Sequence, residues 1–490
     1  MKRISALLAT ATLLATSLTA QQTRTEKDLL GEKQIPADAL YGVQTARALE
    51  NFRISDDKFS DHTNLIKAYA IVKLAAARAN TDVGKMKPEV LAKIQKAYDA
   101  IMAGKYHEWF QVDMYQGGAG TSANMNVNEV MANIALIETG GRIGDYKTVE
   151  PHDHLNASQS TNDSYPTALK IAMILNNKEV IDELTLLIKS FRAIGNKYID
   201  VVKMGRTELQ DAVPMTVGQQ FHAYAEALQW ELDELKYAES KLYGVNMGAT
   251  AIGTGITAPK GYSERCVKHL AELTGKPIHL SSDLIAGTWD MQEYVAYSSQ
   301  LKSLAIKLNK ISSDLRLMAS GPRTGLFEIN LPALQPGSSI MPGKVNPVIP
   351  ELMSEICFRV IGNDVTVSLA SENGDLELNA FEPVVAIAIF ESQELFITGM
   401  RTMRTLCIDG ITVNEAVLKE HIERTVGIVT ALNPVIGYDK ATELAKEALA
   451  TNKGILEIIR EKKVLTEEQI KQLLDPASLT GLDKSKYVGK

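Results

Sequence analysis

The sequence has few cysteines: only Cys266, Cys357 and Cys407 occur among its 490 residues. They are odd in number and far apart, which excludes a disulfide framework and a zinc cluster built on cysteines. We therefore expect all three to be buried as small apolar residues.

An excess of positive charge is also absent. Lys and Arg total 52 against 59 Asp and Glu, for a formal net charge of −7. Such a chain has no general attraction for nucleic acids or anionic membranes, so neither is an expected partner. An anionic small substrate would need a local cluster of donors. The hydrophobic fraction of 45% and the charged fraction of 23% are ordinary for a soluble globular enzyme, and the length suggests about three domains.

Long hydrophobic runs are scarce, and the conspicuous one is at the N-terminus. Lys2 and Arg3 precede residues 4–20, which carry no charge and end on the small Ala20. This order is typical of a secretory signal peptide. A membrane anchor fits less well because the run is short and rich in hydroxyl side chains. We predict a signal peptide over 1–20, a periplasmic or otherwise exported protein and no stable membrane span; the alternative is an N-terminal extension of a cytoplasmic protein.

Two stretches in the middle of the chain repeat apolar residues at alternating spacings of four and three, as one face of a helix requires. They consist of Val180, Leu184, Leu187, Phe191, Ile194, Tyr198 and Val201, and of Leu301, Leu304, Leu308, Ile311, Leu315 and Met318. Such stripes belong to helices that pack nearly parallel to their neighbours. The fold is therefore predicted to be mainly α, a long central helical bundle flanked by two smaller segments. Loops are expected over 116–128, 156–166, 205–218, 246–259 and 320–350.

Residues 337–347, Gly-Ser-Ser-Ile-Met-Pro-Gly-Lys-Val-Asn-Pro, form the richest of these loops. Its glycines allow unusual backbone angles, and its prolines restrict their neighbours. The apolar pair Ile340–Met341 is unusual for a simple polar turn. The pattern is typical of a lid that excludes water while it presents a serine and a cation to a substrate.

This loop resembles the signature of the aspartase/fumarase superfamily of lyases. Three further segments agree with that superfamily in order and spacing: 117–122 (Gly-Gly-Ala-Gly-Thr-Ser), 158–163 (Ser-Gln-Ser-Thr-Asn-Asp) and 205–207 (Gly-Arg-Thr). The resemblance begins at about Arg24 and extends into the C-terminal region.

The resemblance implies a domain organisation and an assembly. An N-terminal lyase domain would cover 24–158, the central helical bundle 159–412 and a small C-terminal domain 413–490. The enzyme would be a homotetramer in which each active site combines loops from three subunits.

Within the superfamily the sequence is most similar to the aspartase branch. Residues 346–351, Asn-Pro-Val-Ile-Pro-Glu, resemble the aspartase form of the signature's tail, whereas fumarases usually continue with Thr-Gln-Cys-Glu. The resemblance implies reversible conversion of L-aspartate to fumarate and ammonia. The nearest rival is a fumarate hydratase acting on L-malate, and a more distant one is a structural oligomer that has lost catalysis.

The resemblance also assigns roles to individual residues. Ser338 would be the base that removes a proton from the carbon beside one carboxylate, which then becomes a dianionic aci-carboxylate. Donors to that group would be Thr121, Ser160, Thr161 and Ser339, short neutral side chains suited to a charge that grows during reaction. Thr207, Lys344 and Asn346 would hold the other carboxylate, and Asn162 would lie near the substrate's amine. Any one of these residues alone would more often be a cap, a turn or a solvated surface residue.

Glu208 departs from the family pattern, which generally has His or Gln after Gly-Arg-Thr. A carboxylate there could pair with the substrate's ammonium and favour an amine over a hydroxyl. Glu351 matches a family acid near this position, and because two close carboxylates repel, one of them would keep its proton. The alternative is that Glu208 turns away from the site.

The sequence does not point to a metal ligand set. His152, Asp153 and His154 lie close together, but neighbouring loop residues rarely reach one ion without a third ligand, and a structural role is favoured. The expected chemistry requires no cofactor. The resemblance leaves room for activation by a divalent cation such as Mg²⁺.

Overall fold

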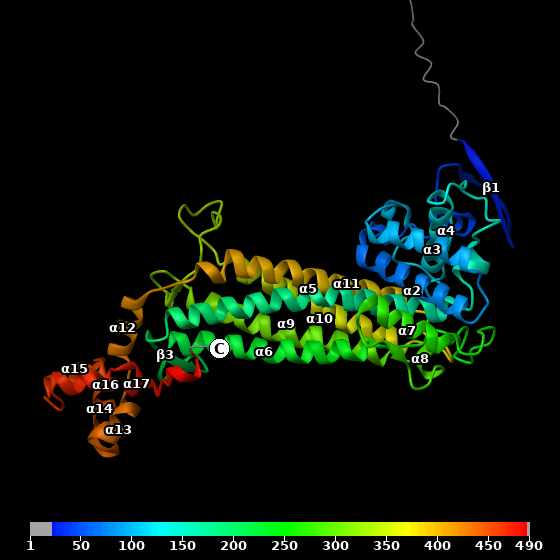
Figure 1. Ribbon diagram of the computed structural model, residues 1–490. Helices are drawn as coiled ribbons and strands as arrows, with labels where there is room; N and C mark the ends of the chain where they lie inside the picture. Colours follow the sequence, from blue (N-terminus) through cyan, green and yellow to red (C-terminus); the bar gives the residue numbers. More distant parts are fainter. Residues whose placement is uncertain (1–21, 488–490) are drawn as a thin grey trace, which may run out of the picture.

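The computed structural model describes residues 22–487. The signal peptide predicted for 1–20 lies outside them. Five long helices form a bundle. The bundle is elongated, with a globular region at one end and a smaller helical region at the other (Figure 1). The five are α5 (Thr161–Lys197), α6 (Val217–Lys241), α9 (Gln292–Met318), α10 (Val348–Glu372) and α11 (Glu382–Leu406). They pack as a closed ring in the order α5, α6, α9, α10, α11, so each helix contacts two neighbours.

The bundle confirms the two predicted stripes. The stripe from Val180 to Ile194 lies on α5 and is buried, as is the stripe from Leu301 to Met318 on α9. Tyr198 and Val201, the last two residues of the first stripe, lie beyond the end of α5. Because both stripes are covered inside one chain, they provide no evidence for association between chains.

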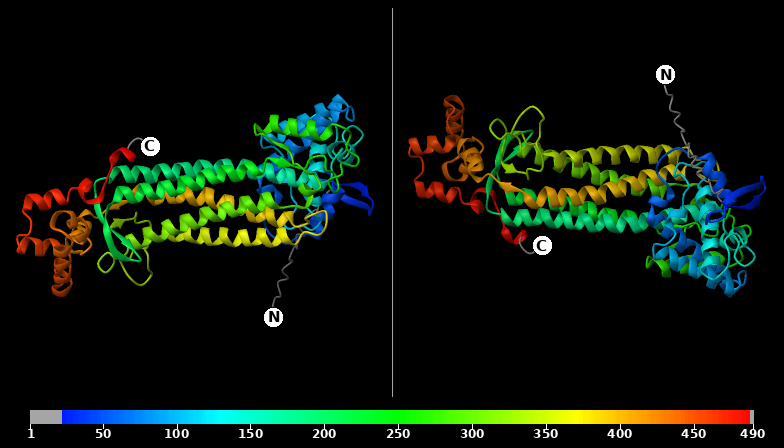
Figure 2. Two further views of the ribbon diagram at one scale, coloured as in Figure 1. Left: turned by 90° about the horizontal axis from the view of Figure 1, so that it is seen from below. Right: turned by 90° about the horizontal axis from the view of Figure 1, so that it is seen from above.

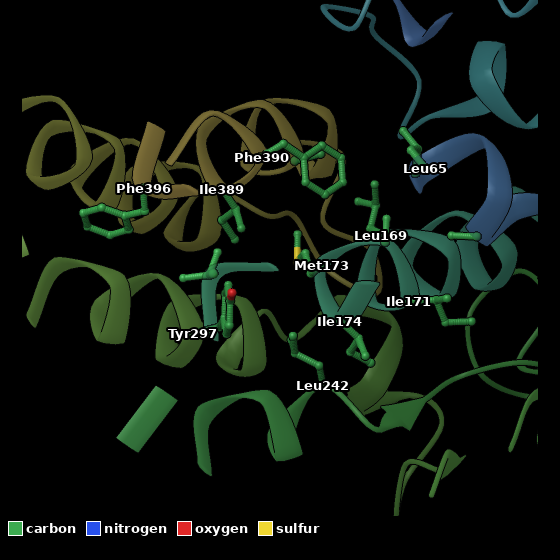
Figure 3. Close-up of a cluster of buried hydrophobic side chains, with 14 of the residues drawn as sticks. Leu65, Leu169, Ile171, Met173, Ile174, Leu242, Tyr297, Ile389, Phe390 and Phe396 are labelled. Carbon is green, nitrogen blue, oxygen red and sulfur yellow. The ribbon is translucent and has the colours of Figure 1, made fainter. Parts of the chain in front are cut away.

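The bundle core continues into the globular region without a break. Figure 3 shows Leu169, Met173 and Ile174 of α5 beside Ile389 and Phe390 of α11, with Tyr297 of α9 close by. These side chains belong to one hydrophobic cluster that also contains the core of helix α2. The cluster ties the globular region rigidly to the helix ends beside it. The domain boundaries inferred from the sequence remain predictions.

The globular region is built mainly from the first part of the chain. It contains β1 (Thr23–Asp28), β2 (Gly31–Pro36), α1 (Val43–Asn51), α2 (Thr63–Asp82), α3 (Pro88–Met102), α4 (Thr121–Ile137) and a π-helical turn (Pro151–Leu155). Strands β1 and β2 pair antiparallel from Thr23–Pro36 to Asp28–Gly31. The later helices α7 (Tyr262–Thr274) and α8 (Ala286–Trp289) join this region, and α7 packs on α2.

The opposite end of the bundle carries two small antiparallel sheets and the C-terminal helices (Figure 2). The sheets are β3 (Val202–Thr207) with β4 (Gln210–Thr216), and β7 (Ile329–Asn330) with β8 (Thr412–Val413). The helices are α12 (Glu415–Arg424), α13 (Val429–Ile436), α14 (Tyr438–Thr451), α15 (Ile455–Glu461), α16 (Glu467–Leu473) and α17 (Pro476–Thr480). They enclose a separate hydrophobic core that also takes in Met204 of β3. A short parallel pair, β5 (Gly244–Val245) and β6 (His279–Leu280), lies after α6.

Four of the predicted loops are partly wrong. Residues 121–128 begin α4, residues 161–166 begin α5, 205–218 contain most of the β3–β4 hairpin, and 320–350 contain β7 and the first residues of α10. In α4 the polar residues Asn124, Asn126 and Asn128 are buried, so a polar run that resembles a loop in the sequence is an interior helix. The hairpin needs Gly205, because a Cβ there would lie 2.8 Å from the carbonyl oxygen of Val213.

Two further expectations concern burial. Cys266, Cys357 and Cys407 are free and buried, as predicted. One described helical segment, Glu382–Gly410, is long and apolar enough to cross a membrane, but 61% of its most apolar window is buried inside the protein, as in a core helix.

Candidate active site

The predicted site residues fall into two groups at opposite ends of the bundle. Thr121, Ser160, Thr161 and Asn162 lie at the starts of α4 and α5, beside the globular region. Thr207 and the signature loop lie at the other end, after α5 and before α10. Helix α5 has 37 residues, which corresponds to a length of about 55 Å. One chain therefore brings together the members of each group but not the two groups.

In the first group, two helix N-termini present hydroxyl side chains. Thr121 is the first residue of α4, and Ser160 caps α5, its hydroxyl accepting from Asn162 N at 3.2 Å. The two helices are joined by Asn124, whose Nδ2 donates to Thr161 Oγ1 at 3.2 Å. They approach closely at Gly120, where a Cβ would lie 2.5 Å from the Tyr165 ring. Paired helix N-termini with neutral donors suit a carboxylate, because the unpaired N–H groups and the helix dipoles favour negative charge.

A buried lysine supports this group from behind. Lys73 of α2 is 1% exposed, and its Nζ donates to Asn124 Oδ1 at 2.7 Å and Gln159 Oε1 at 3.0 Å. Burial lowers the Lys73 pKa to about 7, although Asp163 acts in the opposite direction. The amide side chains of Asn124 and Asn156 continue the network toward Thr161 and Asn128. This network fixes the residues that carry the first group's hydroxyls.

In the second group, the signature loop closes on itself. Gly337 N donates to the Lys344 carbonyl at 2.7 Å, and Asn346 Nδ2 donates to the Gly337 carbonyl at 2.9 Å. The Ser338 hydroxyl accepts from the backbone N–H groups of Ile340 and Met341 at 3.2 and 3.0 Å. Two fixed donors on one oxygen stabilise negative charge there, which an alkoxide needs.

The remaining side chains of the loop are open to solvent in the single chain. Ser339 and Lys344 are exposed, and Ile340 is 83% exposed. An exposed isoleucine on a polar loop agrees with a lid whose apolar side is covered by something outside this chain.

The tip of the β3–β4 hairpin places Thr207 and Glu208 at the same end of the bundle as this loop. Thr207 pairs with Gln210, leaving Glu208 and Leu209 as a two-residue turn with φ of 54° and 64°. Neither residue is a glycine, so the turn is strained, as backbone at functional sites often is. Both side chains are exposed. Glu351 lies in the first turn of α10, directly after the signature loop, and is partly exposed.

Several residues near the first group were not identified from the sequence. Asp163, Lys73 and Asn124 are buried polar residues that bind the segments carrying Ser160, Thr161 and Asn162. Ser160 and Asp163 form a capping box, a pattern that is visible in the sequence. For Lys73, the sequence signal is a single lysine within the apolar run of α2.

The histidine-rich turn has protein partners. Gln44 Nε2 lies 2.9 Å from His152 Nε2, and His154 Nδ1 accepts from Glu150 N at 2.9 Å. Among residues 22–487, no group of three or more His, Cys, Asp or Glu side chains is arranged to hold a metal ion.

The comparisons with known proteins agree with the fold. The lyase family model matches residues 31–362, and the fumarase C C-terminus model matches residues 428–481. The chain belongs to the aspartase/fumarase lyase family. This confirms the family expected from its motifs and the mainly α fold.

Individual relatives of this lyase match nearly the whole chain. The aspartate ammonia-lyase of Pseudomonas aeruginosa is 50% identical over 457 residues, covering 93% of this chain and 96% of the relative. That of Escherichia coli is 46% identical, with the same coverage.

Solved structures of the lyase family agree equally well. A fumarate lyase:delta crystallin from Brucella melitensis, bound to cobalt, has a TM-score of 0.90 and 46% identity, covering 93% of this chain and 99% of that one. A class II fumarase from Schistosoma mansoni has a TM-score of 0.86 and 32% identity, covering 93% of this chain and 98% of that one.

Proposed function

We propose that this lyase converts L-aspartate reversibly to fumarate and ammonia. The observation that carries the proposal is its similarity to relatives that are themselves aspartate ammonia-lyases. Those from Pseudomonas aeruginosa and Escherichia coli are 46–50% identical over 93% of the chain. The region matched by the lyase family model, residues 31–362, includes the signature loop, whose serine hydroxyl accepts two N–H bonds.

In the proposed mechanism, Ser338 removes the proton from the carbon beside one carboxylate. A serine is a poor base unless its alkoxide is stabilised, and the N–H groups of Ile340 and Met341 supply part of that stabilisation. Closure of the loop would cover Ile340 and remove water from the reacting atoms. Ammonia then leaves from the neighbouring carbon, and the carbanion's electron pair forms the double bond of fumarate.

The two carboxylates of the substrate need different donors. The one that becomes the aci-carboxylate gains charge, and we assign it to Thr121, Ser160, Thr161 and Ser339. The other keeps its charge, and we assign it to Lys344, Asn346 and Thr207. Helix N-termini at α4 and α5 favour the growing charge, so a protein of net charge −7 binds a dianion through local donors.

We propose that the functional unit is a homotetramer whose sites combine different chains. The two groups lie about 55 Å apart along α5, so an antiparallel second chain is needed to bring them together. Helix α10 supports this assembly through exposed apolar side chains on its surface. They are Leu352, Phe358, Val365 and Leu369. Exposed apolar side chains gathered on one helix call for a partner.

The proposed mechanism uses only protein groups, so we propose that no organic cofactor is required. We propose a divalent cation such as Mg²⁺ as an activator only, without assigning it a site. Activity that survives removal of metal by a chelator and rises when Mg²⁺ is added would support this view. Complete loss of activity in the chelator, restored by metal, would make the ion essential and contradict it.

The predicted signal peptide supports a proposal on location: the lyase is exported. Fractionation of cells that make the full-length chain should place the activity in the periplasm or medium, with residues 1–20 removed. Cytoplasmic activity on an uncleaved chain would contradict the proposal.

A paired assay tests the reaction. Purified protein is mixed with L-aspartate or with L-malate, and the ultraviolet absorbance of fumarate is followed. We expect fumarate from L-aspartate together with an equal amount of ammonia. A response to L-malate alone would indicate a fumarate hydratase, and a response to neither a structural oligomer. The hydratase is disfavoured by the Val-Ile-Pro-Glu tail at 348–351 and by Glu208.

A further inference from the structure

Asp163 binds two segments that are far apart in the sequence. It is completely buried in the first turn of α5. Its Oδ1 accepts from Ser160 N at 3.0 Å, which completes the capping box of the helix. Its Oδ2 accepts from Gly248 N and Thr250 N, at 3.1 and 3.0 Å. Capping the helix requires only the bond from Ser160 N. The bonds from Gly248 N and Thr250 N hold a loop that follows α6.

The loop that Asp163 holds has an unusual backbone. Thr250 and Gly248 both have positive φ, 58° and 90°. A Cβ at Gly248 would lie 1.9 Å from Ser263 Oγ, so only glycine fits there. The N–H groups of Gly248 and Thr250, two residues apart, both point to one oxygen of the Asp163 carboxylate, so the loop backbone binds this anion. Without that carboxylate, the strained conformation loses its main support.

The same loop orients Asn162, the residue assigned to the substrate's amine. Asn162 Nδ2 donates to the Ala251 carbonyl at 2.7 Å. A carbonyl accepts only from the NH₂ side of an amide, so this bond fixes which way the Asn162 amide is turned. Its oxygen, Oδ1, is left to accept from a donor on the open side. An ammonium group is such a donor. A second tie supports the arrangement, since Asn246 Nδ2 donates to the Asn162 carbonyl at 3.0 Å.

We propose that Asp163 is a positioning residue for the amine side of the site: it holds the 246–251 loop, which in turn presents the Asn162 amide oxygen to the leaving ammonia. This inference rests on the proposed function, because it concerns the ammonia of that reaction. Asp163 itself touches no reacting atom. It acts through Ala251 and Asn162.

The reverse reaction uses fumarate and ammonia as separate substrates, so KM for ammonia reports on the amine side of the site and KM for fumarate on the carboxylate side. Asp163→Asn leaves one acceptor oxygen for the N–H groups of Ser160, Gly248 and Thr250, so its NH₂ group faces either the helix cap or the loop. Hydrogen exchange of residues 161–164 and of 246–251 identifies which of the two is released, and release of the loop tests the proposal. We expect KM for ammonia to rise by about tenfold or more and KM for fumarate to change by less than about threefold. Hydrogen exchange of residues 246–251 should become faster in the same variant.

Controls make the outcome decisive. The wild-type protein is assayed first, and failure there would reject the proposed function before any variant is compared. Asp364→Asn, which alters another buried carboxylate in the bundle, should leave the ratio of the two KM values unchanged. If Asp163→Asn does not fold, or releases the helix cap instead of the loop, the test is Asn246→Ala, which removes the bond from Asn246 to the Asn162 carbonyl. We expect this variant to raise KM for ammonia by about threefold. Equal changes in both KM values, or none, would overturn the proposal.

Discussion

Lys203 of β3 and Glu328 form a buried ion pair, with Nζ and Oε2 2.6 Å apart. Their side chains are only 5% and 1% exposed. Arg206 binds the second oxygen of Glu328 at 2.5 Å. Burial alone would raise the Glu328 pKa, but the two cations outweigh it and lower the pKa below its usual value. The pair joins the hairpin of Thr207 to the segment that leads into the signature loop, so it fixes the second group of site residues.

Glu328→Gln should therefore weaken both the fold and the site. Lys203 and Arg206 would be left without their shared counter-charge, and we expect unfolding free energy to fall by about 3–5 kcal/mol. Denaturant unfolding measures this loss. Asp182→Asn breaks the exposed Lys178–Asp182 pair and should cost less than about 1 kcal/mol. Equal losses in the two variants would contradict the role of the buried pair.

Ser338→Ala tests the assignment of the base. Because the serine acts on the proton and contributes little to binding, we expect kcat to fall by about 10²–10⁴-fold while KM for L-aspartate changes little. Ser320→Ala, which removes a hydroxyl from the start of the same segment, should retain wild-type turnover. Substantial turnover in the Ser338 variant would remove it from the mechanism.

Glu208→Gln tests whether the carboxylate at the hairpin tip binds the substrate's ammonium. If it does, loss of the charge should raise KM for L-aspartate by about threefold to tenfold. Glu226→Gln alters an exposed carboxylate on α6 and serves as the control. Kinetics that are the same in the Glu208 variant and the wild type would show that Glu208 turns away from the site.

Glu382 predicts a pH dependence of stability. It is 3% exposed, and burial raises its pKa from 4.5 to about 8, although Lys170 acts in the opposite direction. The folded protein therefore holds this proton more tightly than the unfolded chain. Its contribution to stability is full below pH 4.5 and is lost as pH rises through about 8.

Glu382→Gln removes this titration while keeping the shape of the side chain. Relative to wild type, the variant should gain roughly 1.4 kcal/mol of unfolding free energy per pH unit between about pH 5 and 8. Denaturant unfolding at several pH values measures the difference. Parallel stability curves for the two proteins would contradict the raised pKa.

The sequence predicts the parts of the structure that depend on local pattern. Periodic apolar residues such as Leu184 and Leu308 identify the bundle helices, because a helix face repeats every three or four residues. Asn124 and Asn128 do not identify helix α4 in the same way, because they are polar and their burial depends on hydrogen bonds to distant residues such as Asn156. Polar composition alone therefore suggests a loop where α4 begins.

The candidate site shows the same division. Its residues are identified by motif, whereas their distribution between two ends of the bundle follows from the full length of α5. The visible stripe covers only part of that helix. Similarly, the capping box of Asp163 is local, but its bonds to Gly248 and Thr250 join residues more than 80 positions apart. Local patterns do not report such contacts.

We propose that L-aspartate is converted at a site made from opposite ends of different chains. Mixing two inactive variants, Thr161→Val from the first group and Ser338→Ala from the second, tests this most directly. Each variant assembled alone should lack activity, because every site contains the altered residue. In tetramers assembled at random from equal amounts of both, about a quarter of the sites would receive an intact Thr161 from one chain and an intact Ser338 from another. We predict that ammonia release from L-aspartate returns to about that fraction of wild type. No recovery in the mixed tetramers would contradict the account.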